Sequence, residues 1–288
     1  MRYSAGAYTD IGSTRKNNQD SFCVLRGRSS ALGNVLMAVV CDGMGGLSKG
    51  EVASGTVVTA FSDWFTNDLP LRIRECSMRQ MADIWMEMLY GLNERLRDYG
   101  RMRDIQVGTT FSGLFLMGTQ YLWVHVGDSR IYLLREGDMR QLTTDHTVAN
   151  RDRGTGMVKA GTENMLTQCI GVSMALKPDW GMGEMCGRDR FLLCSDGFYH
   201  RIRPSDLTGR MSEEIESGKQ MANLSRELSR LMMERGEKDN VTAVLIGVKE
   251  DEERGLGVWL QGSKRSGRGN GFCVEQELTQ TDSKEILR

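Results

Sequence analysis

Four aspartates stand where predicted strands begin or end, so that each carboxylate leaves the core beside a turn. They are Asp42, Asp128, Asp196 and Asp239. A single aspartate at a strand end is more often a turn or cap residue than a ligand. Sheet edges that face one way can gather such side chains, however, and unpaired carboxylates crowded together repel one another. A divalent ion removes this repulsion, so the pattern predicts a metal site.

The residue types select the kind of metal. The chain has three dispersed histidines and seven cysteines without a C-x-x-C pair, so the candidate ligands are oxygens. Oxygen ligands favour Mg²⁺ or Mn²⁺ over zinc or copper. Two such ions about 3.5–4 Å apart could share a carboxylate and a hydroxide, which is a suitable nucleophile for in-line attack at phosphorus.

Two stretches contain the strongest candidates for metal and phosphate binding. The apolar run Val35–Val40 predicts a buried strand, and three glycines follow Asp42 within four residues. Glycine lets the backbone turn sharply and approach another group closely. Upstream, Arg15 lies in a polar turn before Asp20, where a guanidinium could bind phosphate oxygens bidentately. Taken alone, Arg15 is an ordinary surface arginine.

Other phosphate chemistries lack their motifs. No cysteine is followed by arginine at the C-x5-R spacing of thiol phosphatases, and there is no G-x-x-x-x-G-K-[ST] motif. The glycine-rich stretch Arg153–Gly156 does not follow a predicted strand, so it is weak evidence for nucleotide binding.

Composition sets the class of protein. The 288 residues are 40% hydrophobic and 26% charged with a net charge of -1, which fits one large domain or a domain with a tail. No basic patch indicates nucleic acid as a partner. No apolar stretch approaches the roughly 20 residues that cross a bilayer, and Met1–Ala5 lacks the apolar core of a signal peptide. We therefore expect a cytoplasmic protein without a membrane partner.

Periodicity predicts a mixture of antiparallel strands and amphipathic helices. Apolar residues recur at steps of three and four between Met81 and Leu96, which predicts a helix that Gly100 is well placed to end. Successive strands with short turns imply antiparallel sheet. Strands are expected at 3–8, 21–25, 35–41, 108–117, 121–126, 131–134, 190–195 and 241–248, and further helices at 51–67 and 218–235. Residues 143–178 have poor periodicity and predict an irregular segment.

The last part of the chain has a different composition. Asp251–Arg288 is rich in Gly, Ser and charge, with scattered apolar residues such as Trp259 and Phe272. This composition predicts a flexible tail after a catalytic domain at 1–250, and its removal is expected to leave the core folded.

The motifs taken together resemble those of the metal-dependent serine/threonine protein phosphatases of the PP2C (PPM) family, in their compact bacterial form. They run in family order over nearly all of residues 1–250. The matching stretches are Arg15-x-x-Asn18-Gln19-Asp20, Val40-Cys41-Asp42-Gly43-Met44-Gly45-Gly46, Gly108-Thr109-Thr110, Val126-Gly127-Asp128-Ser129-Arg130-Ile131-Tyr132, Thr144-Asp145-His146, Leu166-Thr167-x-x-Ile170-Gly171, Cys194-Ser195-Asp196-Gly197 and Asp239-Asn240-Val241-Thr242.

The resemblance implies an α+β fold, a four-layer α-β-β-α sandwich of two antiparallel sheets flanked by helices. It implies that Asp42 bridges two Mn²⁺ or Mg²⁺ ions and that the Gly43 carbonyl binds the second. Asp20 would hold metal-bound water and Arg15 the substrate phosphate. Asp196 and Asp239 would complete the first ion's ligands, and Asp128 with Asp196 would bind a third, weaker ion. The segment from Asp145 to Gly171 corresponds to the family's flap beside the active site.

Two residues depart from common family patterns. Many members have Glu where this chain has Gln19, so one water-mediated contact to the second ion would come from a neutral amide, which predicts a weaker second ion. Many eukaryotic members have His where this chain has Met44, which cannot donate a proton. Bacterial members commonly share the Met, so metal-bound water would protonate the leaving group.

The sequence thus predicts a phosphatase that hydrolyses phosphoserine and phosphothreonine in proteins modified by a serine/threonine kinase, and that acts as a monomer. Two alternatives stay open. One is a phosphatase-fold module that binds a partner without catalysis, although Asp42, Asp196 and Asp239 are all present. The other is a hydrolase of small phosphorylated metabolites, which the metal centre alone cannot separate from a protein phosphatase.

Overall fold

The structure, a computed structural model, describes residues 1–30, 32–44, 49–153, 158–211, 217–250 and 272–281. Its strands are β1 (Arg2–Asp10), β2 (Asp20–Ser29), β3 (Gly33–Asp42), β4 (Phe111–Met117), β5 (Gln120–Val126), β6 (Arg130–Arg135), β7 (Asp138–Gln141), β8 (Asp179–Glu184), β9 (Arg190–Cys194), β10 (Val241–Lys249) and β11 (Phe272–Gln280). Its helices are α1 (Gly50–Asp63) with the π-helical turn η1 (Trp64–Asp68), α2 (Leu69–Arg72), α3 (Met78–Arg103), α4 (Val148–Arg151), α5 (Asp196–Tyr199), α6 (Pro204–Met211) and α7 (Gly218–Glu234).

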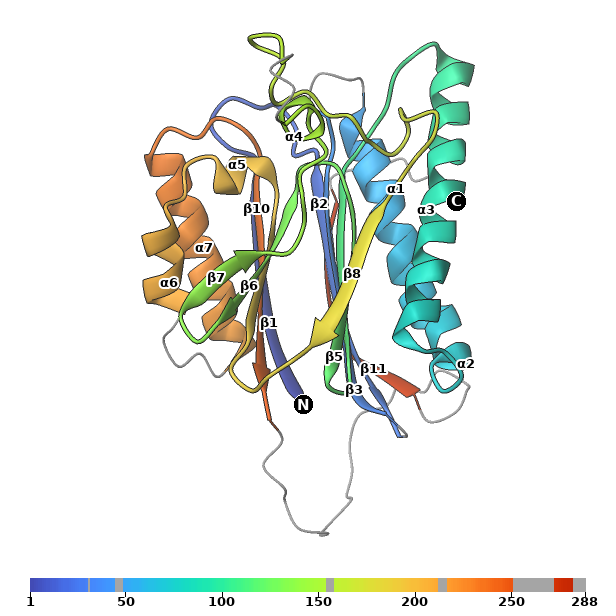
Figure 1. Cartoon of the computed structure of the whole chain (residues 1–288), viewed down its shortest axis with the longest axis vertical. Coiled ribbons are helices and arrows are strands. Elements are labelled where there is room, and N and C mark those ends of the chain that lie inside the picture. Colours follow the sequence, from blue (N-terminus) through green and yellow to red (C-terminus); the bar gives the residue numbers. More distant parts are fainter. Residues whose placement is uncertain (31, 45–48, 154–157, 212–216, 251–271, 282–288) are drawn as a thin grey trace.

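Two antiparallel sheets lie face to face between two helical layers (Figure 1). One sheet has the order β1-β10-β9-β6-β7, and the other has the order β11-β2-β3-β4-β5-β8. Helices α6 and α7 cover the first sheet, and α1 and α3 cover the second (Figure 1). The predicted α-β-β-α sandwich is confirmed.

Three buried clusters fill the spaces between these layers. The cluster between the sheets includes Val40, Leu114 and Phe191, so alternate residues of the facing strands point at each other. The cluster under α1 and α3 centres on Trp85, whose ring meets Phe61 edge-on with centroids 5.2 Å apart. Strands buried on both faces explain why the predicted runs were continuously apolar rather than alternating.

Helix α3 begins and ends at local signals. Ser77 and Gln80 form a capping box, in which the Ser77 side chain accepts from the Gln80 amide. The predicted end at Gly100 is wrong, because the helix continues to Arg103 and Asp104 takes the left-handed conformation at its C-cap with φ 53°. Gly100 serves close approach instead, since a Cβ there would lie 2.7 Å from the Ile105 carbonyl oxygen.

The predicted flexible tail is wrong for its described part. Residues Phe272–Gln280 form β11, which pairs antiparallel with β2 at the edge of the second sheet. The Phe272 side chain is buried, with its ring 5.8 Å from the Phe65 ring. The alternating residues of this short stretch carry a strand signal that the Gly- and Ser-rich composition around it conceals. Trp259 lies outside the described residues, as do Gly45, Gly46 and residues 154–157 of the glycine-rich stretches.

The described residues of the segment 143–178, which are 143–153 and 158–178, are mostly irregular as predicted, with the short helix α4 and isolated bridges such as Thr147 to Leu166. Strand β8 directly after it was not predicted, because its sequence, Asp179–Glu184, contains two glycines and only two large apolar residues. Within the described residues, no helix combines the length and the apolar character that crossing a membrane requires.

Candidate metal centre

Strand register brings two of the predicted carboxylates together. Asp20 begins β2 and Asp42 ends β3, and the two residues are direct partners in the β2–β3 ladder. Asp42 is fixed by Thr110, whose hydroxyl accepts from the Asp42 amide at 2.9 Å and whose own amide donates to the Asp42 carbonyl at 2.9 Å. These two hydrogen bonds join Asp42 to a residue that lies 68 positions further along the chain.

The facing sheet delivers two more carboxylates to the same end of the sandwich. Asp196 follows β9 and begins α5, and Asp239 stands two residues before β10. Strands β9 and β10 are neighbours, so the two aspartates leave adjacent strands. The sequence prediction that strand ends gather these side chains is in line with this placement.

Two hydroxyl groups of the facing sheet bind the Asp20 side chain. Its Oδ2 accepts from Ser195 Oγ at 2.8 Å and from Thr242 Oγ1 at 2.6 Å. Its Oδ1 is buried and has no hydrogen-bond partner. An orphaned buried carboxylate oxygen is costly, so this atom fits a position that a water molecule or a cation would satisfy. Ser195 and Thr242 stand within the matching motifs but carry no charge, so composition gives no signal for them.

Crowding perturbs the whole set of carboxyl groups. Burial raises the pKa of Asp42 well above its ordinary value, and the nearby carboxyls of Asp20 and Asp196 raise it further. The pKa values of Asp20 and Asp196 are also raised, in each case first by burial. Such shifts mark a site that is short of positive charge.

The Gly43 backbone requires the absence of a side chain. A Cβ at Gly43 would lie 2.4 Å from the Gly50 carbonyl oxygen and 2.6 Å from that of Gln19. The Gly43 amide donates to the Gln19 carbonyl at 3.0 Å, and Gly43 forms an isolated bridge with Thr109. These contacts fix the position of the peptide group whose carbonyl is the predicted ligand.

Asp128 lies beside a buried ionic network. Burial, with smaller contributions from Asp196 and Asp145, raises the pKa of Asp128 to about 7. Two residues on, the Arg130 guanidinium donates to Asp145 at 2.6–3.1 Å and stacks on the Tyr199 ring at 3.5 Å. Arg130 thus joins β6, the start of the flap and α5, and it holds the turn that carries Asp128.

The Arg15 guanidinium forms an ion pair with Asp239. Its Nε donates to Asp239 Oδ1 at 2.7 Å and its Nη2 to Asp239 Oδ2 at 2.5 Å. The predicted phosphate-binding group therefore meets a predicted metal ligand directly, which the sequence could not show.

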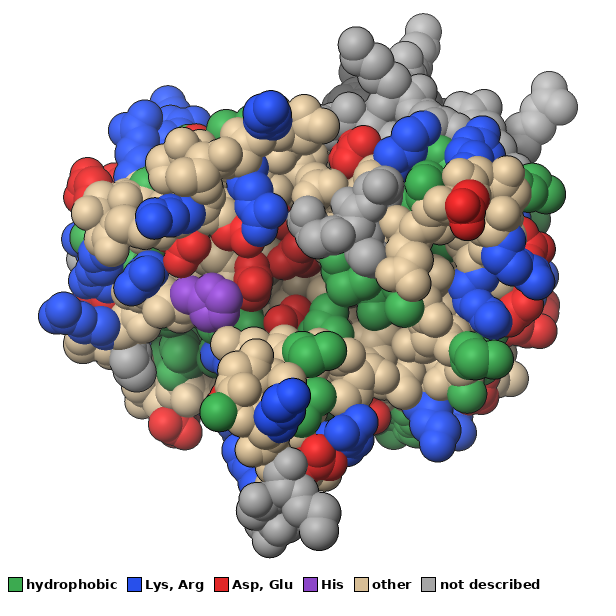
Figure 2. All heavy atoms as spheres, turned by 90° about the horizontal axis from the view of Figure 1, so that it is seen from above, with side chains coloured by type: hydrophobic (Ala, Val, Ile, Leu, Met, Phe, Trp, Pro, Cys, Tyr) green, Lys and Arg blue, Asp and Glu red, His purple; other side chains and the backbone are tan. Residues whose placement is uncertain are grey.

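Several observations test whether a divalent ion fits these residues. The donors are carboxylate and carbonyl oxygens, the pKa values of the carboxyls are raised, and one buried carboxylate oxygen lacks a partner. Figure 2 shows acidic side chains lining a hollow on this face. In the described ranges, however, no three His, Cys, Asp or Glu side chains are already gathered closely enough to hold an ion. The donor set fits Mn²⁺ or Mg²⁺ when the ion takes the place of the Arg15 guanidinium at Asp239.

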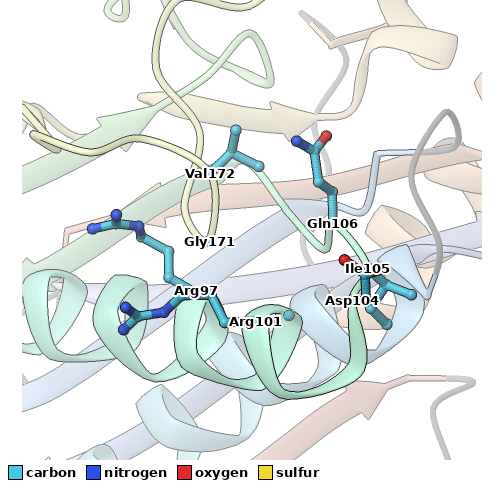
Figure 3. A pocket seen from close by; sticks show the side chains of 8 residues that line it. Arg97, Arg101, Asp104, Ile105, Gln106, Gly171 and Val172 are labelled. Carbon is cyan, nitrogen blue, oxygen red and sulfur yellow. The ribbon is translucent and has the colours of Figure 1, made fainter.

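A pocket of about 320 Å³ lies beside the end of the flap (Figure 3). Arg97 and Arg101 on α3 and Val172 after the flap contribute to its walls. The Asn93 side chain fixes the flap end by accepting from the Gly171 amide at 2.8 Å.

The model of the protein phosphatase 2C family matches residues 13–245, which is most of the chain. The chain belongs to the protein phosphatase 2C family.

Individual relatives agree with this assignment. The chain is 28% identical over 257 residues to protein phosphatase PhpP of Streptococcus pneumoniae. The aligned residues cover 85% of this chain and 97% of that protein. The Streptococcus agalactiae serine/threonine phosphatase superposes with a TM-score of 0.72 at 28% identity, over 86% of this chain and 100% of that one. The catalytic domain of the phosphatase PstP, solved with two manganese ions, superposes with a TM-score of 0.67 at 28% identity, over 86% and 99% of the two chains.

Proposed function

We propose that this chain is a metal-dependent phosphatase that removes phosphate from phosphoserine and phosphothreonine in proteins. The observation that carries the proposal is that Asp20 and Asp42 are direct partners in the β2–β3 ladder, with Asp196 and Asp239 near enough that the pKa of Asp42 is raised by burial first and also by all three neighbouring carboxyls. Membership of the protein phosphatase 2C family and the names of the relatives support the same reaction.

Each residue has a proposed role. Asp42 would bridge two ions of Mn²⁺ or Mg²⁺, with the Gly43 carbonyl at the second ion and Asp196 and Asp239 at the first. Asp128 would share a third, weaker ion with Asp196. When bound, the ions would activate water for attack on phosphorus and neutralise the phosphoryl oxygens.

The protein's own groups would do the rest. Asp20, oriented by Ser195 and Thr242, would accept a hydrogen bond from the attacking water through its partnerless Oδ1. Arg15 would bind the phosphate of the substrate bidentately, because its guanidinium already makes two parallel bonds to a carboxylate of similar shape.

The proposed substrate is a protein phosphorylated by a serine/threonine kinase, and the enzyme is proposed to act as a monomer in the cytoplasm. All seven cysteines are free, which suits a reducing compartment. Residues beside the phosphorylated one would lie along the flap and the pocket of Arg97 and Val172.

Phosphate release from a phosphothreonine peptide, compared with release from glycerol phosphate, tests the proposal. With Mn²⁺ the full chain should hydrolyse the peptide with a higher kcat/KM, and EDTA should abolish the activity. Hydrolysis of glycerol phosphate alone would indicate the metabolite hydrolase. Absence of any hydrolysis together with absence of Mn²⁺ binding would indicate the non-catalytic module.

A further inference from the structure

The chain has a carboxylate beside Gln19 that could supply the charge which the neutral amide lacks. Gln19 Nε2 donates to Glu51 Oε2 at 3.3 Å. Glu51 stands in the first turn of α1, 32 residues from Gln19 in sequence. We propose that Glu51 is the outer carboxylate for the second ion, which rests on the metal-dependent function proposed above.

The helix that carries Glu51 starts at Gly50, close to the backbone of Gly43. A Cβ at Gly50 would lie 3.0 Å from the Gly43 carbonyl oxygen and 2.7 Å from Gln19 Nε2. Gly50 is therefore wedged between the proposed ligand of the second ion and the Gln19 amide. Glu51 is the next residue, so the first turn of α1 starts beside the carbonyl that would bind the ion.

Ser54 fixes Glu51 in this position. One turn along α1, its hydroxyl donates to the Gln19 carbonyl at 2.6 Å and lies 2.9 Å from Ser21 Oγ. The same Gln19 carbonyl accepts from the Gly43 amide at 3.0 Å. One peptide oxygen thus ties α1, the start of β2 and the end of β3 together, which holds Glu51 near Gly43.

The charge on Glu51 is not used elsewhere in the described part of the chain, where its carboxylate meets only the Gln19 amide and forms no ion pair. A carboxylate in the first turn also stabilises its helix by its interaction with the helix dipole. That role predicts an effect of Glu51 on stability but none on metal binding, so the two roles can be separated by experiment.

Mn²⁺ titration by calorimetry separates them without reference to activity. The full-length wild-type chain should bind two ions tightly, apart from the third, weaker ion. Glu51→Gln should weaken the weaker of the two tight ions by about tenfold, the usual effect of losing an outer-shell carboxylate. The swapped double variant Gln19→Glu/Glu51→Gln should restore the lost affinity. Glu87→Gln, which removes an exposed glutamate on α3, is the matched control and should leave both steps unchanged.

Unchanged Mn²⁺ affinities in folded Glu51→Gln would overturn the inference and leave the proposed function standing. A swap that fails to restore the affinity would also overturn it, since the charge would then not be what matters. Failure of the wild-type chain to bind Mn²⁺ would instead overturn the proposed function, and this inference with it. Thermal melts of all four proteins show whether the variants fold.

Discussion

Arg15 and Asp239 form a two-bond ion pair across 224 residues of sequence, with Nε to Oδ1 at 2.7 Å and Nη2 to Oδ2 at 2.5 Å. Asp239 is a proposed ligand of the first ion, and Arg15 is the proposed phosphate-binding group. An ion and the guanidinium would therefore compete for the same carboxylate, and binding of the ion would make Arg15 available to the substrate.

Replacing Arg15 tests this competition. Because an exposed ion pair contributes at most about 1 kcal/mol, Arg15→Gln should tighten Mn²⁺ binding by up to about fivefold. The same variant should raise KM for a phosphothreonine peptide, since it removes the bidentate phosphate contact. Calorimetry and steady-state kinetics measure the two effects. Weaker Mn²⁺ binding in Arg15→Gln would contradict the competition.

Asp128 has a different expected effect. Asp128→Ala should lower kcat by about tenfold while sparing the two tight ions, because only the third ion depends on Asp128. The measurement combines kcat with an Mn²⁺ titration of the same sample. Full activity after loss of the third ion would show that this ion has no part in the reaction.

His125 gives the folded protein a pH dependence. Burial, as the larger cause, and the neighbouring His146 together lower the pKa of His125 from an ordinary value of 6.5 to about 4, against the opposing effect of Asp145 and Asp179. Between these two values the unfolded chain binds a proton that the folded protein does not. The stability contributed by neutral His125 is therefore present above about pH 6.5 and lost as the pH falls toward 4.

Urea unfolding of the wild type and of His125→Gln at pH 7 and pH 5 measures this contribution. The advantage of the wild type should shrink by about 2 kcal/mol at pH 5. The difference between the proteins removes the effects of other titrating groups that both share. A difference that does not depend on pH would contradict the buried neutral ring.

Because β11 pairs with β2, we expect truncation before β11 to lower the stability of the protein. Removing residues 251–288 takes away β11 and the buried Phe272 side chain, so the melting temperature should fall. Phe272→Ala alone should cost about 3 kcal/mol. A chain ending at Thr281 retains β11 and is the control. Equal melting temperatures of the two truncated chains would contradict the placement of β11.

Most of the fold could be predicted from the sequence, because the long strands and α3 show themselves as local patterns of apolar residues. Strands β7, β8 and β11 were missed. Strand β7 has only four residues, and glycines in β8 and the composition around β11 hide strands whose stability comes from pairing with β5 and β2. The carboxylates could be predicted because charge at a strand end is visible in a sequence. Ser195, Thr242 and the Arg15–Asp239 pair could not, because they are contacts between distant segments that only the folded sheets bring together.

The most direct test of the metal-dependent reaction is phosphate release from a phosphothreonine peptide with Mn²⁺, for wild type, Asp42→Asn and the exposed control Asp138→Asn. Loss of the bridging charge should lower the rate of Asp42→Asn by about 100-fold or more, since the ions supply several kcal/mol of transition-state stabilisation. Asp138→Asn should match the wild type. Equal rates for wild type and a folded Asp42→Asn would contradict the account.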